Sequence, residues 1–235
     1  MFFQYLFIFF VSCNLFGQVE QVDYRVFIDP SHFDNSPELL KNMGSSVLAD
    51  TKENLRDLSF SLYYDDKYSY YVKNEELSND GSRGINIVKI LGGNNYYTDL
   101  QAHKSLQITR LAPDQLVLNN AVEWTIHSST KQILNTKTFK ATGILTYQNL
   151  RGDIKSKNIE AWFAPSIPTS AGPDRFCGLP GLILAVKSPI DGLQIIAQRY
   201  KKKIKKKVIS IPNYPIISEI ELTKRLRKMR ESMRN

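Results

Sequence analysis

The chain has 235 residues, 42% of them hydrophobic and 23% charged, with 12 Gly, 10 Pro and 2 Cys. This composition excludes a disordered chain, a collagen-like repeat and a disulfide scaffold, and the length suits one domain with a buried core. The net charge is +8, but residues 201–235 hold 12 of the 31 Lys and Arg and 3 of the 23 Asp and Glu, which leaves 19 against 20 in residues 1–200. The basic character therefore belongs to the C-terminal tail and predicts no basic groove in the body.

The N-terminus predicts export. Residues 2–12 are almost wholly apolar and uncharged, too short to span a bilayer as a helix, which needs about 20 residues, but long enough for a signal peptide. We expect a signal peptide over residues 1–17, one β-rich domain over 18–217 and a basic helix over 218–235. The protein would be periplasmic, outer-membrane-associated or secreted, and an exported protein rarely meets nucleic acid. Lipidation at Cys13 is an alternative, because Val11-Ser12-Cys13 resembles a lipobox.

Alternating apolar and polar residues predict strands along most of the body. Residues 57–64 and 68–72 form a hairpin around Asp65-Asp66-Lys67, where turn chemistry is expected of the two carboxylates. Residues 92–95, rich in Gly and Asn, are predicted as a break between strands. The other predicted strands are residues 23–28, 85–91, 105–109, 115–118, 122–127, 139–147, 159–163, 182–186 and 193–200. Many short strands at this spacing predict a mainly β fold, an antiparallel barrel, half-barrel or sandwich.

Two helices are expected. Ser36 and Pro37 predict the start of a helix that runs to about residue 48. Ser218, followed by Glu221, has the spacing of a capping box and predicts the start of the C-terminal helix. An apolar stripe then follows, which would dock on the body or contact a membrane or partner: Leu222, Leu226, Met229 and Met233.

Residues 164–192 hold five of the ten Pro and four of the twelve Gly. This density indicates a fixed backbone path, with a type II turn over residues 179–182 that places Gly181 at positive φ. We expect Gly181→Val to destabilise the fold by about 1–3 kcal/mol. The five apolar residues 182–186 that follow predict a strand buried on both sides or lining an apolar cavity.

The same segment carries a resemblance to a known family. The six residues from Gly178 to Ile183 resemble the signature of the GLPGLI family of exported Gram-negative bacterial proteins. Thr138 stands where family members often have a Cys, so any role of that Cys does not transfer. The resemblance implies export and a shared fold, and the family's biochemical function is unassigned. Between Gly178 and Ile183 the signature consists of Leu179, Pro180, Gly181 and Leu182. Further matching positions are Trp124, Lys131, Ile133, Lys140, Ala141, Thr142, Ala161, Trp162, Phe163, Ala164, Pro165, Ile167, Pro168, Gly172, Pro173 and Phe176.

No catalytic, metal-binding or nucleotide-binding motif is present, so we expect no cofactor, no metal and a non-enzymatic protein. His32, His103 and His127 lack metal-ligand spacing. The alternative is an enzyme with Cys177 as nucleophile, because this thiol lies in a Gly- and Pro-rich loop beside Asp174-Arg175, although the sequence identifies no base.

The leading hypothesis is a ligand-binding half-barrel. An apolar ligand, such as a lipid, would enter a cavity whose mouth is lined by five side chains, and the alternative is that they close a crowded corner of the barrel. These side chains are Trp162, Phe163, Phe176, Leu179 and Leu182.

A second hypothesis is a partner-binding accessory of an outer-membrane protein that uses its basic tail and strand edges. The run from Lys201 to Lys207 is lysine-rich apart from Ile204. It would contact anionic lipid, lipopolysaccharide or another polyanion, or alternatively protect a strand edge from pairing.

Overall fold

The computed structural model describes residues 18–28, 59–74, 94–109, 111–149, 152–188, 193–205 and 209–232. The predicted signal peptide with Cys13, the helix over residues 37–48, the strand over 85–91, and His32 lie outside these ranges. The strands are β1 (Val19–Ile28), β2 (Ser59–Tyr64), β3 (Tyr68–Lys73), β4 (Asn95–Asp99), β5 (Lys104–Thr109), β6 (Ala112–Leu118), β7 (Glu123–Ile133), β8 (Thr136–Gln148), β9 (Ile154–Ala164), β10 (Leu182–Ser188), β11 (Leu193–Ile204) and β12 (Ile216–Ser218), and helix α4 (Glu219–Ser232) follows.

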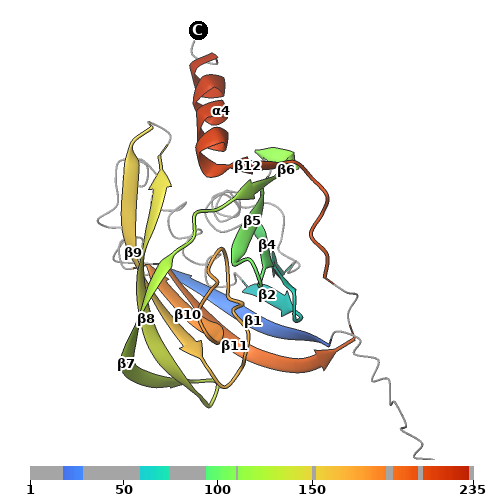
Figure 1. Ribbon diagram of the computed structural model, residues 1–235, viewed down its shortest axis with the longest axis vertical. Coiled ribbons are helices and arrows are strands. Elements are labelled where there is room, and N and C mark those ends of the chain that lie inside the picture. Colours follow the sequence, from blue (N-terminus) through green and yellow to red (C-terminus); the bar gives the residue numbers. More distant parts are fainter. Residues whose placement is uncertain are drawn as a thin grey trace, which may run out of the picture.

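The described strands form one open sheet in the order β12-β6-β5-β4-β3-β2-β1-β11-β10-β9-β8-β7 (Figure 1). Every pair of neighbours is antiparallel except β12 with β6, which is parallel. The mainly β prediction of half-barrel type is therefore confirmed, because the sheet does not close on itself.

The short link between β6 and β7 makes the sheet curl. These strands lie near opposite ends of the strand order, yet only four residues separate Leu118 from Glu123. Even fully extended, that link spans about 18 Å. The link is also anchored to β5, because the Asn119 backbone N–H donates to the Ser105 carbonyl at 3.0 Å. The two ends of the sheet therefore face each other without pairing, and we call this junction the seam.

The predicted hairpin over β2 and β3 is confirmed. Asp65 Oδ1 accepts hydrogen bonds from the backbone N–H groups of Lys67 and Tyr68, both at 2.8 Å, which is the turn chemistry expected of this carboxylate. At the predicted break over residues 92–95, Asn95 already begins β4, a strand that the sequence did not predict. Tyr70 and Tyr97 face each other across β3 and β4 with rings stacked at 4.4 Å, and such cross-strand pairs outweigh a local turn preference.

The hairpin of β7 and β8 is longer than the sequence predicts. Its strands meet at Leu134 and Asn135, whose φ angles are 51° and 57°. Two consecutive positive φ angles make a type I′ turn, which suits the twist of a hairpin. The extension was missed because residues 128–132 are all polar and show no apolar alternation.

Strand β10 is buried on both sides, as expected. Leu182 and Leu184 join one hydrophobic cluster with side chains of β1, β2, β3, β4 and β11. Ile183 and Val186 join a second cluster with side chains of β8 and β9. One apolar strand therefore holds together the two halves of the core.

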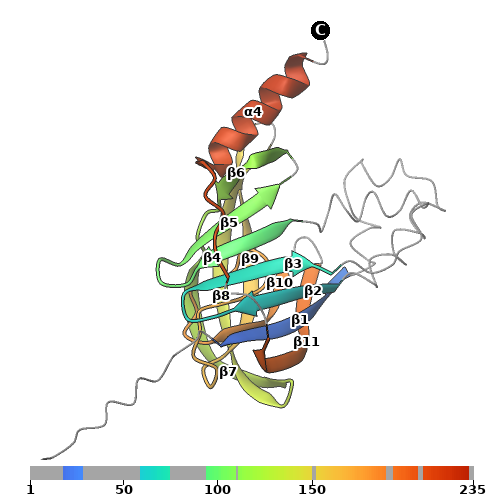
Figure 2. The same cartoon turned by 90° about the vertical axis from the view of Figure 1, so that its right-hand side faces the viewer.

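Helix α4 begins as predicted, since Ser218 Oγ accepts a hydrogen bond from the Glu221 N–H at 3.1 Å. Leu222 packs against Ala112, Val117 and Ile217. Further along the stripe, Met229 is 58% exposed, and α4 stands away from the strands in both views (Figure 2). Leu222 and Leu226 are partly buried, so the stripe is covered over its first part and exposed at Met229, while Met233 lies outside the described residues. None of the helices described is long and apolar enough to cross a membrane.

The lysine-rich part of β11 lies on a local edge. β10 pairs with β11 only at residues 193–196, whereas β11 continues along β1 as far as Ile204. Lys201, Lys202 and Lys203 fall in this overhang, where the side toward β10 has no strand partner in the described part of the chain. This position agrees with lysines that protect a strand edge.

Candidate functional site

The segment that joins β9 to β10 packs against both core clusters. We call residues 165–188, this loop together with β10, the motif segment. Ala171 belongs to the first cluster, and Phe176 and Leu179 belong to the second. Backbone hydrogen bonds tie the loop to itself and to β10, from Gly178 to Ser170 at 3.0 Å and from Ile183 to Ala171 at 3.0 Å. The loop is therefore part of the core.

The turn at Gly181 differs from the predicted type II turn. Gly181 has φ 153°, and its N–H donates to the Leu179 carbonyl at 2.8 Å, while the Leu182 N–H donates to Ile167 at 3.1 Å. The Ile167 carbonyl, near the beginning of the loop, thus accepts the hydrogen bond that the Leu179 carbonyl would accept in a type II turn. A pattern of neighbouring residues could not predict this contact. Glycine is required all the same, because a Cβ here would lie 2.4 Å from the Ala164 carbonyl oxygen.

The other motif glycines have distinct roles. A Cβ on Gly172 would lie 2.4 Å from the Phe176 carbonyl oxygen and 2.8 Å from Ile183 Cδ1, so this glycine allows the loop to lie on β10. The Pro173 carbonyl accepts the Phe176 N–H at 3.2 Å, which closes a short turn beside it. Gly178 has φ 90° and no atom within 3.8 Å of the Cβ position, so there the backbone angle alone calls for glycine.

The five residues predicted to line a cavity are only partly brought together. Phe163, Phe176 and Leu179 pack in the second cluster and Leu182 in the first, each at most 5% exposed. Trp162 follows the opposite face of β9. Of the five, only Leu179 lines either pocket described below. Leu179 therefore keeps its predicted place at a pocket, while Phe163, Phe176 and Leu182 have protein neighbours in the core.

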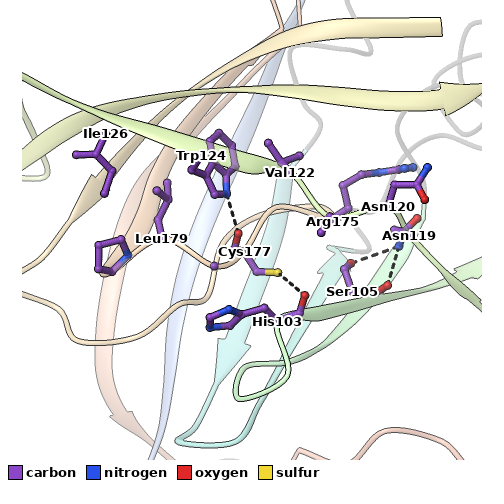
Figure 3. Close-up of a pocket in the computed structure, with 13 residues that line it drawn as sticks. His103, Ser105, Asn119, Asn120, Val122, Trp124, Ile126, Arg175, Cys177 and Leu179 are labelled. Carbon is purple, nitrogen blue, oxygen red and sulfur yellow. Dashed lines mark hydrogen bonds between the residues drawn. The ribbon is translucent and has the colours of Figure 1, made fainter.

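A pocket of about 290 Å³ lies at the seam, between the β6–β7 link, the start of β7 and residues 175–180 of the motif segment. Figure 3 shows its apolar side chains Ile126, Trp124 and Leu179 toward one end and Arg175, Asn119 and Ser105 toward the other. We call it the seam pocket. Its volume is at the lower end of the range for small-molecule sites.

The apolar wall is fixed by Trp124. Its Nε1–H donates to the Cys177 carbonyl at 2.9 Å, and its ring meets the Phe176 ring edge-on at 6.3 Å. Ile126, two residues along the same strand, is 50% exposed. Leu179 and Pro180 complete this wall from the motif segment. An exposed isoleucine beside a rigid tryptophan makes an apolar surface at the mouth of the pocket.

The polar wall is neutral overall. Ser105 and Asn119 are buried, and Asn119 Nδ2 donates to Ser105 Oγ at 3.3 Å, while the buried Asn119 Oδ1 accepts no hydrogen bond. Arg175 forms an ion pair with Glu219 of α4 and lies 3.9 Å from Asp174. Although burial opposes it, these carboxylates and Tyr96 hold the Arg175 pKa above its usual value. The arginine charge is thus already compensated, which makes this wall a poor site for an anion.

Cys177 is placed unfavourably for catalysis. Its Sγ lies 3.7 Å from the His103 carbonyl oxygen, and burial raises the pKa of the thiol to about 11. The thiol is therefore protonated at neutral pH and is a weak nucleophile. Among the residues with described structure, no three His, Cys, Asp or Glu side chains gather as they would around a metal ion.

A second, more polar pocket of about 410 Å³ lies at the other end of the same loop, lined by residues 166–170 and the ends of β1, β2 and β11. Glu20 accepts hydrogen bonds from both Tyr64 and Tyr200, whose hydroxyls are 3.1 Å apart. Sequence reasoning missed this cluster, because its members are 44 to 180 residues apart in the chain. It also missed most of the seam pocket for the same reason.

Comparisons with known proteins support the fold and leave the function open. A family described as "Protein of unknown function (Porph_ging)" matches residues 148–185, which span β9, the loop and half of β10. No curated protein matches the chain. Two structures of PNGF-II, in the P21 and C2 space groups, are similar to 89% of this chain with TM-scores of 0.52 and identities of 14% and 13%. The chain covers about a third of their length, 33% and 32%, and at this identity the likeness shows the fold alone.

Proposed function

We propose that the chain is an exported, non-enzymatic binding protein of the GLPGLI type, and that it holds its ligand in the seam pocket. The observation that carries this proposal is the position of the motif: Cys177, Gly178, Leu179 and Pro180 form one wall of the pocket. The strand they lead into is fixed in both clusters, so that wall is rigid before any ligand arrives. A preformed wall lowers the entropic cost of binding.

The pocket favours a small, uncharged molecule with an apolar body and a hydrogen-bonding end. Its volume of about 290 Å³ equals roughly ten water molecules at ~30 Å³ each, which is small for a lipid. The apolar body would lie against Trp124 and Ile126, and the hydrogen-bonding end would lie toward the polar side chains of Ser105 and Asn119. The proposal therefore narrows the ligand from the apolar ligand or lipid first expected to a small amphiphile.

The test uses three probes of one shape, benzyl alcohol, benzoate and benzylamine, titrated into the full mature chain. A Trp162→Phe background leaves Trp124 as the reporter, since the chain has 2 Trp. We expect saturable quenching of Trp124 with benzyl alcohol, and much weaker responses to the two charged probes. Ile126→Lys should weaken binding about tenfold or more, because it brings a charge into the apolar wall.

Ile144→Lys is the matched control. Ile144 is a 60% exposed isoleucine on the neighbouring strand β8 and does not line the pocket. Its replacement should leave binding unchanged. Equal binding of all three probes, or equal loss in the two variants, would refute a specific seam pocket. N-terminal sequencing of protein from the native host should start at Gln18 if export follows the predicted cleavage.

The proposal that the protein is not an enzyme has its own test. Cys177 should react with iodoacetamide at pH 8 at least ten times more slowly than a free thiol, because the raised pKa leaves little thiolate. Urea should restore the ordinary rate. Rapid alkylation of the folded protein would instead support the Cys177-dependent enzyme.

A further inference from the structure

Strand β7 is the terminal strand of the sheet. One edge pairs with β8, and the other has no strand partner within the part of the chain that the structure describes. Most of its side chains are exposed, and it contains no proline. Sheets commonly protect such edges with charges, prolines or bulges, because a row of unpaired N–H and C=O groups can pair with another chain.

The protection of β7 is incomplete. A register shift between Ile126 and Thr130 acts as a bulge and divides the edge into two parts. The second part, residues 130–133, pairs regularly with β8, from Thr130 opposite Phe139 to Ile133 opposite Thr136. Lys131 is its single charged residue. Three of its four residues are polar, and the stretch is long enough to give backbone hydrogen bonds to an added strand.

The outer face beside this edge carries excess positive charge. Lys131 Nζ lies 4.1 Å from the Trp162 ring centroid, Lys140 pairs with Glu160 at 2.7 Å, and Lys187 lies opposite Glu160 in the strand register. Trp162 Nε1–H donates to the same Glu160 at 2.9 Å. Three lysines on β7, β8 and β10 thus share one carboxylate. Burial, together with Lys140 and Lys187, lowers the pKa of Lys131 although Glu160 opposes this.

We propose that the free edge of β7 over residues 130–133 binds an extended acidic peptide segment of a partner protein as an added strand. The backbone of the peptide would continue the sheet, and alternate side chains would project on the face of Trp162. An acidic side chain there would lie beside Lys131 and balance part of the positive charge of the three lysines around Glu160. This interaction goes beyond the seam pocket, since none of residues 130–133 lines that pocket.

Charge complementarity favours this occupant over a second copy of the chain. An antiparallel pairing of two 130–133 stretches would bring the two Lys131 side chains to opposite or neighbouring positions. Like charges across a strand pair are destabilising. A partner with acidic residues at alternate positions would instead be attracted to Lys131. An extended segment also needs no groove, because the strand edge itself supplies the hydrogen bonds.

The experiment uses a fluorescein-labelled hexapeptide in which Glu alternates with Val or Thr, and the full mature chain. We expect a saturable rise in fluorescence anisotropy that weakens with added salt. Hydrogen exchange should slow at the alternate amides of residues 130–133, those that point away from β8. Two control peptides should fail to bind: one with Lys in place of each Glu, and one with N-methyl groups on alternate backbone nitrogens, which removes the donors that pair with the edge.

Lys131→Glu and Lys137→Glu form the matched pair of variants. Lys137 is on the same hairpin but lies over Phe139, on the opposite face, at 5.2 Å from that ring. Lys131→Glu should weaken peptide binding about tenfold, because a favourable cross-strand charge pair becomes repulsive, and Lys137→Glu should change it little. Ile126→Lys, which blocks the seam pocket, should leave peptide binding intact, so the two proposals can fail separately.

Several outcomes would overturn the proposal. Binding of the N-methylated peptide would show that the edge backbone is not used, and equal loss in both lysine variants would show nonspecific attraction to a basic protein. Sedimentation that reveals a dimer which the peptide dissociates would assign the edge to a second copy of the chain. Protection confined to the lysines at 201–205 would assign the binding to β11.

Discussion

The motif segment and helix α4 differ in how much of each packs against the rest of the protein. The motif segment joins both core clusters, and every residue from Leu182 to Val186 is buried. Helix α4 packs through Leu222 near its beginning and then leaves the body, so that Met229 is largely exposed. The contrast shows that burial here depends on how many elements meet at a residue, because β10 and α4 are both regular secondary structure and only β10 is buried over most of its length.

The two regions meet at one ion pair. Arg175 of the motif segment contacts Glu219 in the first turn of α4, and both side chains are mostly buried, 18% and 15% exposed. Glu219 also fits the helix dipole, because it lies at the N-terminal end. The beginning of α4 is thus joined to the core by this ion pair, whereas Met229, near the other end of the helix, is largely exposed. Four substitutions test whether the contribution to stability falls from the motif segment to the end of α4.

The largest effect is expected at Gly181. Gly181→Ala should destabilise the fold by about 4 kcal/mol, because backbone strain at positive φ adds to overlap with the Ala164 carbonyl. Gly178→Ala is the control, since Gly178 has positive φ but its Cβ would make only ordinary van der Waals contacts with His103, and it should cost only about 1–2 kcal/mol. Urea unfolding measures both. Equal losses would show that the close approach at residue 181 does not matter.

Truncation inside β10 should cost nearly as much. Ile183 is fully buried in the second cluster. Ile183→Ala should lower the free energy of unfolding by about 3 kcal/mol, through lost burial and the cavity left behind. Calorimetry at constant pH gives the value. A loss below about 1 kcal/mol would mean that the two clusters repack around β10 and that it does not hold them together.

Breaking the ion pair should have an intermediate effect. Glu219→Gln removes the carboxylate that balances the positive charge of the mostly buried Arg175 guanidinium. We expect the free energy of unfolding to fall by about 2 kcal/mol. Glu221→Gln is the exposed control in the same helical turn, since Glu221 pairs only with Arg225 at the surface, and its loss should be below about 1 kcal/mol. Similar values for both variants would contradict a coupled first turn.

The smallest effect is expected at the end of α4. Met229→Ala should change the free energy of unfolding by less than about 0.5 kcal/mol, because the side chain is 58% exposed. Leu222→Ala, in the docked part of the same stripe, should cost clearly more. A large loss at Met229 would reveal a contact of the helix end, for instance with a second copy, that depends on protein concentration.

Features that depend only on residues close together in the sequence were predicted correctly. The Asp65 turn, the Ser218 cap and the burial of residues 182–186 follow from side chains within a few positions of one another. Errors arose where pairing with another strand determines the local structure. Asn95 enters β4 because Tyr96 and Tyr97 find partners on β3, and residues 128–133 extend β7 because β8 returns alongside them.

The candidate site was predicted only in part. The sequence located the motif segment and Leu179, but placed Trp162 with side chains that lie on the opposite face of β9. The seam pocket also needs His103, Ser105, Asn119 and Trp124, which come from a different part of the chain. No spacing rule joins them to residues 175–180, because their proximity arises from the curl of the whole sheet.

The sequence by itself determined the mainly β fold, the buried apolar strand and the need for glycine at residue 181, because alternation, hydrophobicity and backbone freedom act over short distances. The tertiary structure alone decided where the two sheet ends meet, which turn Gly181 adopts and which side chains share a pocket. These depend on one short link between β6 and β7, and on pairings between residues far apart in the chain.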